Sequence, residues 1–232
     1  MRRYIKTIFG RQVEEFTSSQ EFVALEEGSA GRADYDHFLA NVFSSHAMSP
    51  HFLSFLFSLA PPASAEAIKH NLLEELGLEE EDGISHPALL ERLMRDAGMA
   101  GRLDELRDGA RRRLSDHVRQ PILYASLREV GLSALVQIVA FEYMLSRVAS
   151  RIARFLHLHR DVPEQDLVWF THHAEVDVRH AEEGIDNILA HIEAYDFDPE
   201  EARDIVDVAL RENIFIKSYF GAEAAIRRGR AA

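Results

Sequence analysis

Residues 171–184, THHAEVDVRHAEEG, gather side chains that can bind a metal ion. An α-helix turns about 100° per residue, so with His173 taken as zero Asp177 lies at about 40° and His180 at about −20°. Gly184 follows at about 20° and leaves space beside them. Two imidazoles and a carboxylate therefore share one narrow stripe. The stripe predicts a metal site if it faces the protein interior, and an ordinary polar surface if it faces water.

Other ligands must come from neighbouring helices, because a dinuclear metal centre in a helix bundle takes about six side-chain ligands. Glu142 is the clearest partner. It lies in the apolar stretch GLSALVQIVAFEYMLSRVA, where Ile138 and Leu145 share its face and Ser146 leaves room. A glutamate in such surroundings is costly to bury unless it is paired or bound to a metal. The alternative is that Glu142 belongs to a polar seam of its helix.

Two further candidates flank a polar loop. Glu75 shares a helix face with Ile68 and Leu72, whereas Glu74 points toward the more charged side. The alternative for Glu75 is a solvated carboxylate near a helix end. His86 lies at the start of the next helix and, taken alone, is most simply an exposed histidine.

The other histidines receive ordinary assignments. His51 and His191 are predicted to lie at the surface, and His37 and His46 in the core or an interface. The ferritin-like signature, Glu-x-x-His on two separate helices, is absent from the sequence. A ferritin-like centre is therefore disfavoured.

The composition indicates one sizeable domain without thiols. A chain of 232 residues with no repeat or linker predicts a single domain over residues 1–232. The lack of cysteine excludes disulfides, thiolate metal sites and cysteine nucleophiles. The net charge of −13 argues against a nucleic-acid partner. No apolar run approaches the ~20 residues that span a bilayer, and the start lacks the apolar core of a secretory signal. We therefore expect a cytoplasmic protein with no membrane partner.

The elements that must position these ligands read as successive helices, with no convincing alternating strand. Pro50 predicts a break, Gly77 a helix end, Ser85 an N-cap and Pro121 an interruption. The expected fold is an all-α bundle of seven or eight helices. The predicted segments are 11–27, 34–60, 64–76, 87–98, 101–118, 123–158, 164–195 and 199–228.

The order of the candidate ligands along the chain resembles that of a known family. NLLEELG, SHPALL, FEYML and HAEVDVRH supply them in turn. The arrangement is similar to that of the haem-oxygenase-like di-iron oxidases and oxygenases, which include the chlamydial death-domain-associating protein. The resemblance implies a haem-oxygenase-like helical bundle with six metal ligands, namely Glu75, His86, Glu142, His173, Asp177 and His180. The choice of Glu75 over Glu74 and of His173 over His172 stays open.

The same resemblance implies the chemistry. Imidazole and carboxylate ligands without thiolate suit iron or manganese, and iron is implied because the similar enzymes activate dioxygen. We expect two ferrous ions per chain, with dioxygen and a small amino-acid-like or fatty-acid-like molecule as substrates. A substrate carboxylate would favour a nearby arginine, for which Arg147 and Arg151 are candidates. A homodimer is also expected from the resemblance.

Other functions compete with this hypothesis. Metal-independent enzymes of the same fold include a thiaminase-like branch, which needs a cysteine that this chain lacks, and a pyrroloquinoline-quinone-forming branch. Haem oxygenase itself needs a proximal histidine near the first helix, yet residues 1–36 contain no histidine. A non-catalytic helical interaction protein is the alternative from a different class.

Overall fold

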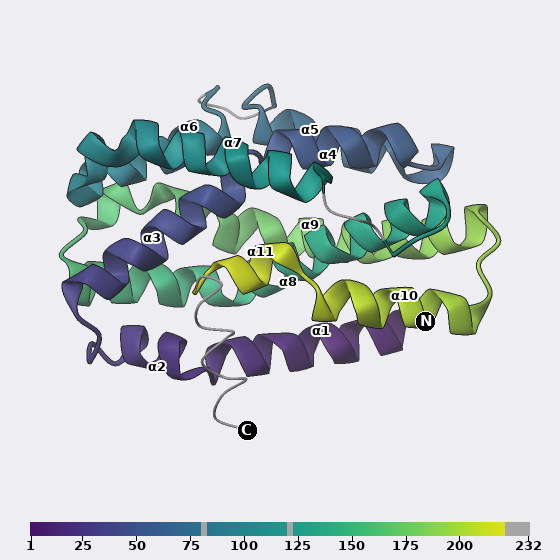
Figure 1. Cartoon of the computed structure of the whole chain (residues 1–232), viewed down its shortest axis with the longest axis horizontal. Helices are drawn as coiled ribbons and strands as arrows, with labels where there is room; N and C mark the ends of the chain where they lie inside the picture. The colour runs from purple at the N-terminus through teal and green to yellow at the C-terminus, as the bar shows by residue number, and fades with distance from the viewer. Residues whose placement is uncertain (80–82, 120–122, 221–232) are drawn as a thin grey trace.

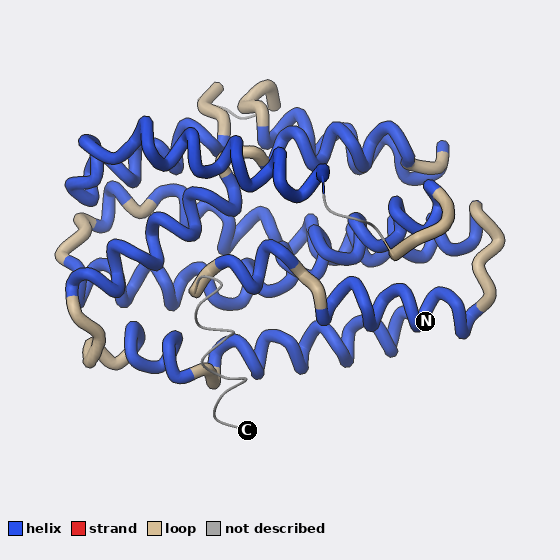
Figure 2. Tube along the Cα trace, in the orientation of Figure 1, coloured by secondary structure: helices blue, strands red, loops and turns tan. Residues whose placement is uncertain are grey.

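Helices account for almost all of the regular structure in the computed structural model, which describes residues 1–79, 83–119 and 123–220 (Figures 1 and 2). These residues contain no strand. Eight of their eleven α-helices have eleven or more residues, which confirms the predicted all-α bundle. The helices are α1 (Arg2–Thr17), α2 (Gln20–Glu26), α3 (Arg32–His46), α4 (Ser49–Leu59), α5 (Pro62–Glu75), α6 (His86–Met94), α7 (Leu103–Arg119), α8 (Leu127–Arg160), α9 (Val168–Ala194), α10 (Pro199–Arg211) and α11 (Ile214–Ser218).

The long helix α8 forms the centre of the bundle. Helix α9 packs along it, α1, α4 and α10 cover other faces of α8, and α5 and α6 pack against α9 (Figure 1). By length and a mean hydropathy of 1.3 over its apolar window, α8 would also pass as a membrane-spanning helix, but 67% of that window is buried inside the protein. Its apolar residues are thus covered by the neighbouring helices.

Local sequence signals account for several helix boundaries. Helix α3 ends before Pro50 and α4 begins at Ser49, as the predicted break requires. The Ser85 hydroxyl accepts a hydrogen bond from the backbone N–H of Ala88 and so caps α6. Gly77 follows α5 in a left-handed conformation with φ of 73°. The predicted interruption at Pro121 lies outside the described residues.

Two predicted segments are corrected. The segment 11–27 is two helices, because Ser19 caps α2 by accepting from the N–H of Phe22. The last segment, 199–228, breaks in its described part at Asn213, whose side-chain oxygen caps α11. In both places a side-chain oxygen satisfies N–H groups that a continuous helix would have satisfied with its own backbone.

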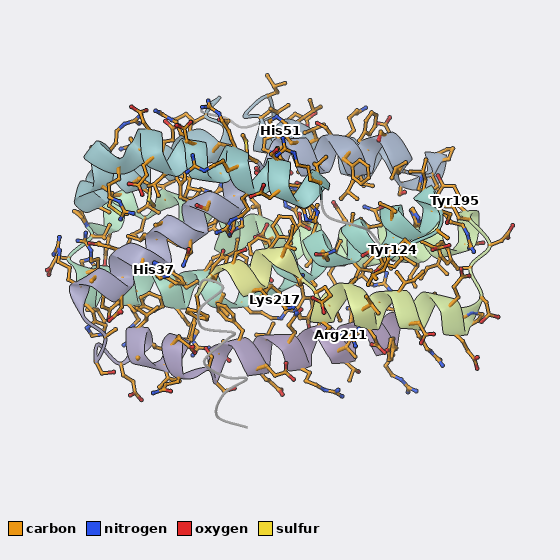
Figure 3. The ribbon with its side chains drawn as sticks, in the orientation of Figure 1. His37, His51, Tyr124, Tyr195, Arg211 and Lys217 are labelled. Carbon is orange, nitrogen blue, oxygen red and sulfur yellow. The ribbon has the colours of Figure 1, made fainter. Side chains whose placement is uncertain are left out.

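Burial corrects two histidine assignments as well. His37 is exposed rather than in the core, and Figure 3 shows it on the outer side of α3, while His51 is exposed as predicted. His191 is buried rather than exposed, and its Nε2 donates to the backbone oxygen of Arg128. His46 is buried, which confirms its prediction.

Candidate metal centre

The six predicted ligands converge from four helices. Glu75 is the last residue of α5 and His86 is the first residue of α6. Glu142 lies in the middle of α8, and the remaining three lie on consecutive turns of α9. Five of the six are buried, and the Glu75 side chain keeps only 13% of its surface exposed. The stripe on α9 therefore faces the protein interior and not water.

Glu75, His86 and His173 form the tighter half of the centre. Oε1 of Glu75 lies 3.0 Å from Nδ1 of His86 and 4.0 Å from Nε2 of His173. One ligand atom from each of the three lies within 4.8 Å of the other two. Nδ1 of His173 donates to the backbone oxygen of Trp169 at 2.6 Å, which leaves Nε2 without a proton. Metal-binding histidines are commonly oriented in this way: the ring nitrogen that does not bind the metal donates a hydrogen bond to a carbonyl or carboxylate.

The loop between α5 and α6 brings Glu75 and His86 together. A Cβ atom on Gly77 would lie 2.6 Å from the carbonyl carbon of Ile84 and 2.7 Å from the backbone nitrogen of Ser85. Only glycine therefore allows the returning chain to approach this closely. This return places His86 beside the end of α5 after eleven residues.

Glu142, Asp177 and His180 form the second half, together with Glu74. Nδ1 of His180 lies 3.4 Å from Oδ1 of Asp177, and its Nε2 donates to Oε2 of Glu74 at 2.6 Å. The amide of Asn71 donates to Oε1 of Glu142 at 2.8 Å. From the sequence, Glu74 is expected only as an alternative to Glu75. In the structure the two adjacent glutamates serve different halves of the centre.

The charges of the second half are unbalanced. Burial raises the pKa of Glu142 to about 7, and repulsion from Asp177 and Glu75 adds to this effect. Burial likewise raises the pKa of Asp177 to about 6, although His180 opposes the rise. Oδ2 of Asp177 is buried and has no hydrogen-bond partner among the described residues. The cluster therefore holds more carboxylate than its neighbours neutralise.

Two other groups are fixed in their charged forms. Burial opposes ionisation of Glu75, yet its neighbours, chiefly His86, lower its pKa to about 2. Burial also opposes protonation of His180, yet its hydrogen bonds to Asp177 and Glu74 raise its pKa to about 10. Protonated His180 thus takes the position of a cation between two carboxylates. As a metal ligand it would be neutral, with Nδ1 free and Nε2–H still held by Glu74.

These residues fit a metal centre by their chemistry. Three imidazoles and three carboxylates without thiolate suit iron or manganese. Oδ2 of Asp177 has no partner among the described residues, and the pKa of Glu142 is raised. Both observations indicate that these carboxylates lack a compensating positive charge. A second cation beside Asp177 would neutralise both groups, whereas leaving them charged and unpaired is costly.

Both neighbouring histidines on α9 reach this region. Nε2 of His172 lies 3.0 Å from Nε2 of His86, and His172 is half-buried. His173 is buried and its ring is oriented by Trp169. His173, rather than His172, is therefore the neighbour that is both buried and held in one ring orientation.

An apolar pocket adjoins the second half of the centre. It is small, with a cavity volume of about 20 Å³, is partly open to solvent, and has Glu142 and His180 among its lining residues. Its lining is mostly aliphatic, and no lysine or arginine belongs to it among the residues that the structure describes. Gly184 leaves less space than predicted, because a Cβ there would lie 2.6 Å from a methyl carbon of Val139. The lining side chains include Leu53, Leu56, Ile68, Leu135, Ile138 and Val139.

The structure does not bring the two candidate arginines to the centre. The Arg147 guanidinium lies over the Tyr143 ring, 3.3 Å from its centroid, and donates to the Tyr143 backbone oxygen. Arg151 makes two hydrogen bonds of 2.7 Å with Glu26. Neither residue lines the pocket. Both lie on turns of α8 beyond Glu142, where the helix faces other partners.

Comparisons with known proteins agree with this arrangement. No curated protein matches the chain. Residues 36–212 match a protein family described as iron-containing redox enzyme, and this range includes all six predicted ligands. The match covers more than half of the sequence, so the chain belongs to the iron-containing redox enzyme family.

Proposed function

We propose that the protein is a non-haem di-iron oxidase or oxygenase that uses dioxygen to oxidise a small molecule. The observation that carries the proposal is the buried set of three imidazoles and three carboxylates in which Asp177 and Glu142 lack compensating charge. Iron, when bound, supplies the electrons that reduce dioxygen, and manganese suits the same ligands.

The six predicted ligands would form two metal positions. Glu75, His86 and His173 would hold one ion, and Glu142, Asp177 and His180 the other. Trp169 keeps the proton of His173 on Nδ1, and Glu74 keeps the proton of His180 on Nε2. Both hydrogen bonds leave the opposite ring nitrogen available as a ligand. Burial excludes bulk water from the reacting groups.

The aliphatic lining of the pocket favours an aliphatic group as the part of the substrate that approaches the centre. Aliphatic side chains line it, and Glu142 and Glu183 are its acidic members. A substrate carboxylate placed there would meet the like charges of Glu142 and Glu183, with no lysine or arginine among the lining residues that the structure describes. A fatty-acid-like substrate would therefore enter with its hydrocarbon end first, and an amino-acid-like one with an apolar side chain first.

Iron binding tests the proposal directly. The purified chain is loaded anaerobically with ferrous iron, and bound iron is measured per chain after removal of excess. We expect about two irons per chain, and loss of uptake in His173→Ala and in Glu142→Ala. The exposed His51→Ala variant is the matched control and should bind iron normally. Circular dichroism shows whether each variant keeps its helices.

Oxygen is then admitted to the loaded protein while visible absorption and oxygen consumption are recorded. Consumption that accelerates with alkyl-chain substrates supports the proposed oxidation. If iron uptake is the same in the wild-type protein, His173→Ala and Glu142→Ala, the di-iron assignment is wrong. A helical interaction protein, or a metal-independent enzyme of this fold, would then be the better explanation.

A further inference from the structure

A line of aromatic rings leads away from the metal centre. Trp169, the only tryptophan in the chain, lies one turn before His173 on α9, and their ring centroids are 4.2 Å apart. The His46 ring of α3 also packs against this indole, with ring centroids 4.9 Å apart. The indole is 1% exposed. Trp169 therefore bridges a predicted ligand and a buried histidine from another helix.

The line ends at a buried tyrosine. Tyr219 follows α11 and is completely buried, and its hydroxyl lies 2.9 Å from Nε2 of His46. Burial lowers the pKa of His46 to about 3, so the imidazole is neutral and has one nitrogen without a proton. The hydroxyl has no other hydrogen-bond acceptor among the described side chains and backbone. The Tyr219 O–H therefore donates to Nε2 of His46.

We propose that Tyr219 is an internal one-electron donor to the metal centre, with Trp169 as the relay and His46 as the proton acceptor. The proposal rests on the proposed function for its oxidant, which is the metal centre after it has reacted with dioxygen. Tyr219 loses the electron, and Trp169 passes it to the metal centre.

The step balances in electrons and protons. Trp169 gives one electron to the oxidised centre, which is reduced by one, and Tyr219 returns one electron to the indole. The phenolic O–H bond breaks, and its proton forms an N–H bond at Nε2 of His46. The net products are a neutral tyrosyl radical, a protonated imidazole and a metal centre reduced by one electron. A small one-electron reductant such as ascorbate restores Tyr219, which takes its proton back.

The surroundings of the two residues favour this direction of transfer. The indole N–H of Trp169 is buried without a hydrogen-bond partner among the described residues. An oxidised indole that keeps its proton is a stronger oxidant than the tyrosyl radical formed when a hydrogen-bonded tyrosine passes its proton to a base. The indole therefore takes an electron from Tyr219. A tyrosine that has lost one electron is also far more acidic than an imidazolium ion, so the proton moves to His46.

Tyr35 provides a matched control within the same core. It is 1% exposed, and its hydroxyl donates at 2.7 Å to the backbone oxygen of Leu25. A backbone carbonyl is a poor base, so Tyr35 has no group that would take its proton on oxidation. The two tyrosines are both buried and hydrogen-bonded, and they differ in the acceptor.

Laser photoionisation tests the line without any turnover. Light at the red edge of the indole absorption, where tyrosine does not absorb, ionises Trp169 in the full-length protein as purified and again with Zn²⁺ added. Zinc does not change its oxidation state, so it cannot return an electron to the oxidised indole. The absorption of the tryptophan radical should decay while that of a tyrosyl radical grows.

Three variants decide the outcome. Tyr219→Phe and His46→Gln should lose the tyrosyl signal and leave a long-lived tryptophan radical, and Tyr35→Phe should behave as the wild type. Circular dichroism and melting curves check that the variants are folded. A tyrosyl radical that persists in Tyr219→Phe, or a tryptophan radical that decays without forming one in the wild type, overturns the proposal.

Electron paramagnetic resonance of the iron-loaded protein frozen after exposure to oxygen provides the second readout. A tyrosyl signal is expected in the wild type and should be lost in Tyr219→Phe, whose iron content stays unchanged. If photoionisation shows the transfer but the chain binds no iron, the proposed function fails and the relay lacks its oxidant. If iron binds but photoionisation shows no transfer, the relay alone is refuted.

Discussion

Replacing Glu142 with glutamine is expected to stabilise the metal-free protein while it weakens iron binding. Glutamine keeps the shape of the side chain and an oxygen to accept from Asn71, but it removes a buried negative charge. Burial raises the pKa of Glu142 from 4.5 to about 7 in the folded protein. One pKa unit corresponds to about 1.4 kcal/mol, so the ionised carboxylate costs the metal-free fold at most ~3 kcal/mol.

The sign of this effect sets its pH dependence. A carboxyl with a raised folded-state pKa binds its proton more tightly in the folded state than in the unfolded state. Its contribution therefore favours folding at low pH and is lost as the pH rises from 4.5 to about 7. The Glu142→Gln variant and the wild type should have similar stability near about pH 4, and should differ by up to ~3 kcal/mol at about pH 8.

Urea unfolding of the metal-free proteins at several pH values measures the difference. The exposed Glu175→Gln, which removes one charge from the outer face of α9, is the control and should stay within ~0.5 kcal/mol of the wild type. Added ferrous iron should raise the wild-type midpoint by binding the folded state, and raise that of Glu142→Gln less. A metal-free Glu142→Gln protein that is less stable than the wild type at about pH 8 would refute the reasoning.

Three further substitutions test other parts of the site. Gly77→Ala should destabilise the protein by ~1–3 kcal/mol and weaken iron uptake, because its Cβ would meet the backbone at 2.6 Å. The control is Gly10→Ala in α1, where nothing lies within 4 Å. This variant should be neutral or stabilising in the same urea titration. Arg151→Ala should cost ~0.5–1 kcal/mol from its exposed pair with Glu26 and leave the KM for a carboxylate substrate unchanged; a large rise in KM would restore Arg151 as a substrate ligand. Ala67→Phe, on the pocket wall, should raise the KM for alkyl substrates without changing iron content, and an unchanged KM would place substrate entry elsewhere.

The features that depend on a single helix or a single turn can be predicted from the sequence alone. The angles between His173, Asp177 and His180 follow from helical periodicity, and the structure finds all three buried on one face of α9. Gly77 and Ser85 end and begin their helices for local reasons of backbone conformation and capping. These features need no contact between distant parts of the chain, so their patterns could be recognised in advance.

Which helix faces contact one another depends on the packing of the whole chain, and it is seen only once the chain is folded. Glu74 and Glu75 differ by about 100° on α5, so they meet different partners. Glu74 contacts His180 of α9, whereas Glu75 contacts His86 of α6 and lies 4.0 Å from His173 of α9. Periodicity could not foresee this arrangement.

The arginines beyond Glu142 illustrate the same limit. Their sequence separation from Glu142 suggested proximity to the site, but Arg151 meets Glu26 of α2 and Arg147 turns onto Tyr143. Likewise, the line from His173 through Trp169 and His46 to Tyr219 joins three helical regions that no sequence pattern relates. Helical periodicity fixes directions within one helix, whereas contacts between helices depend on how the whole core packs.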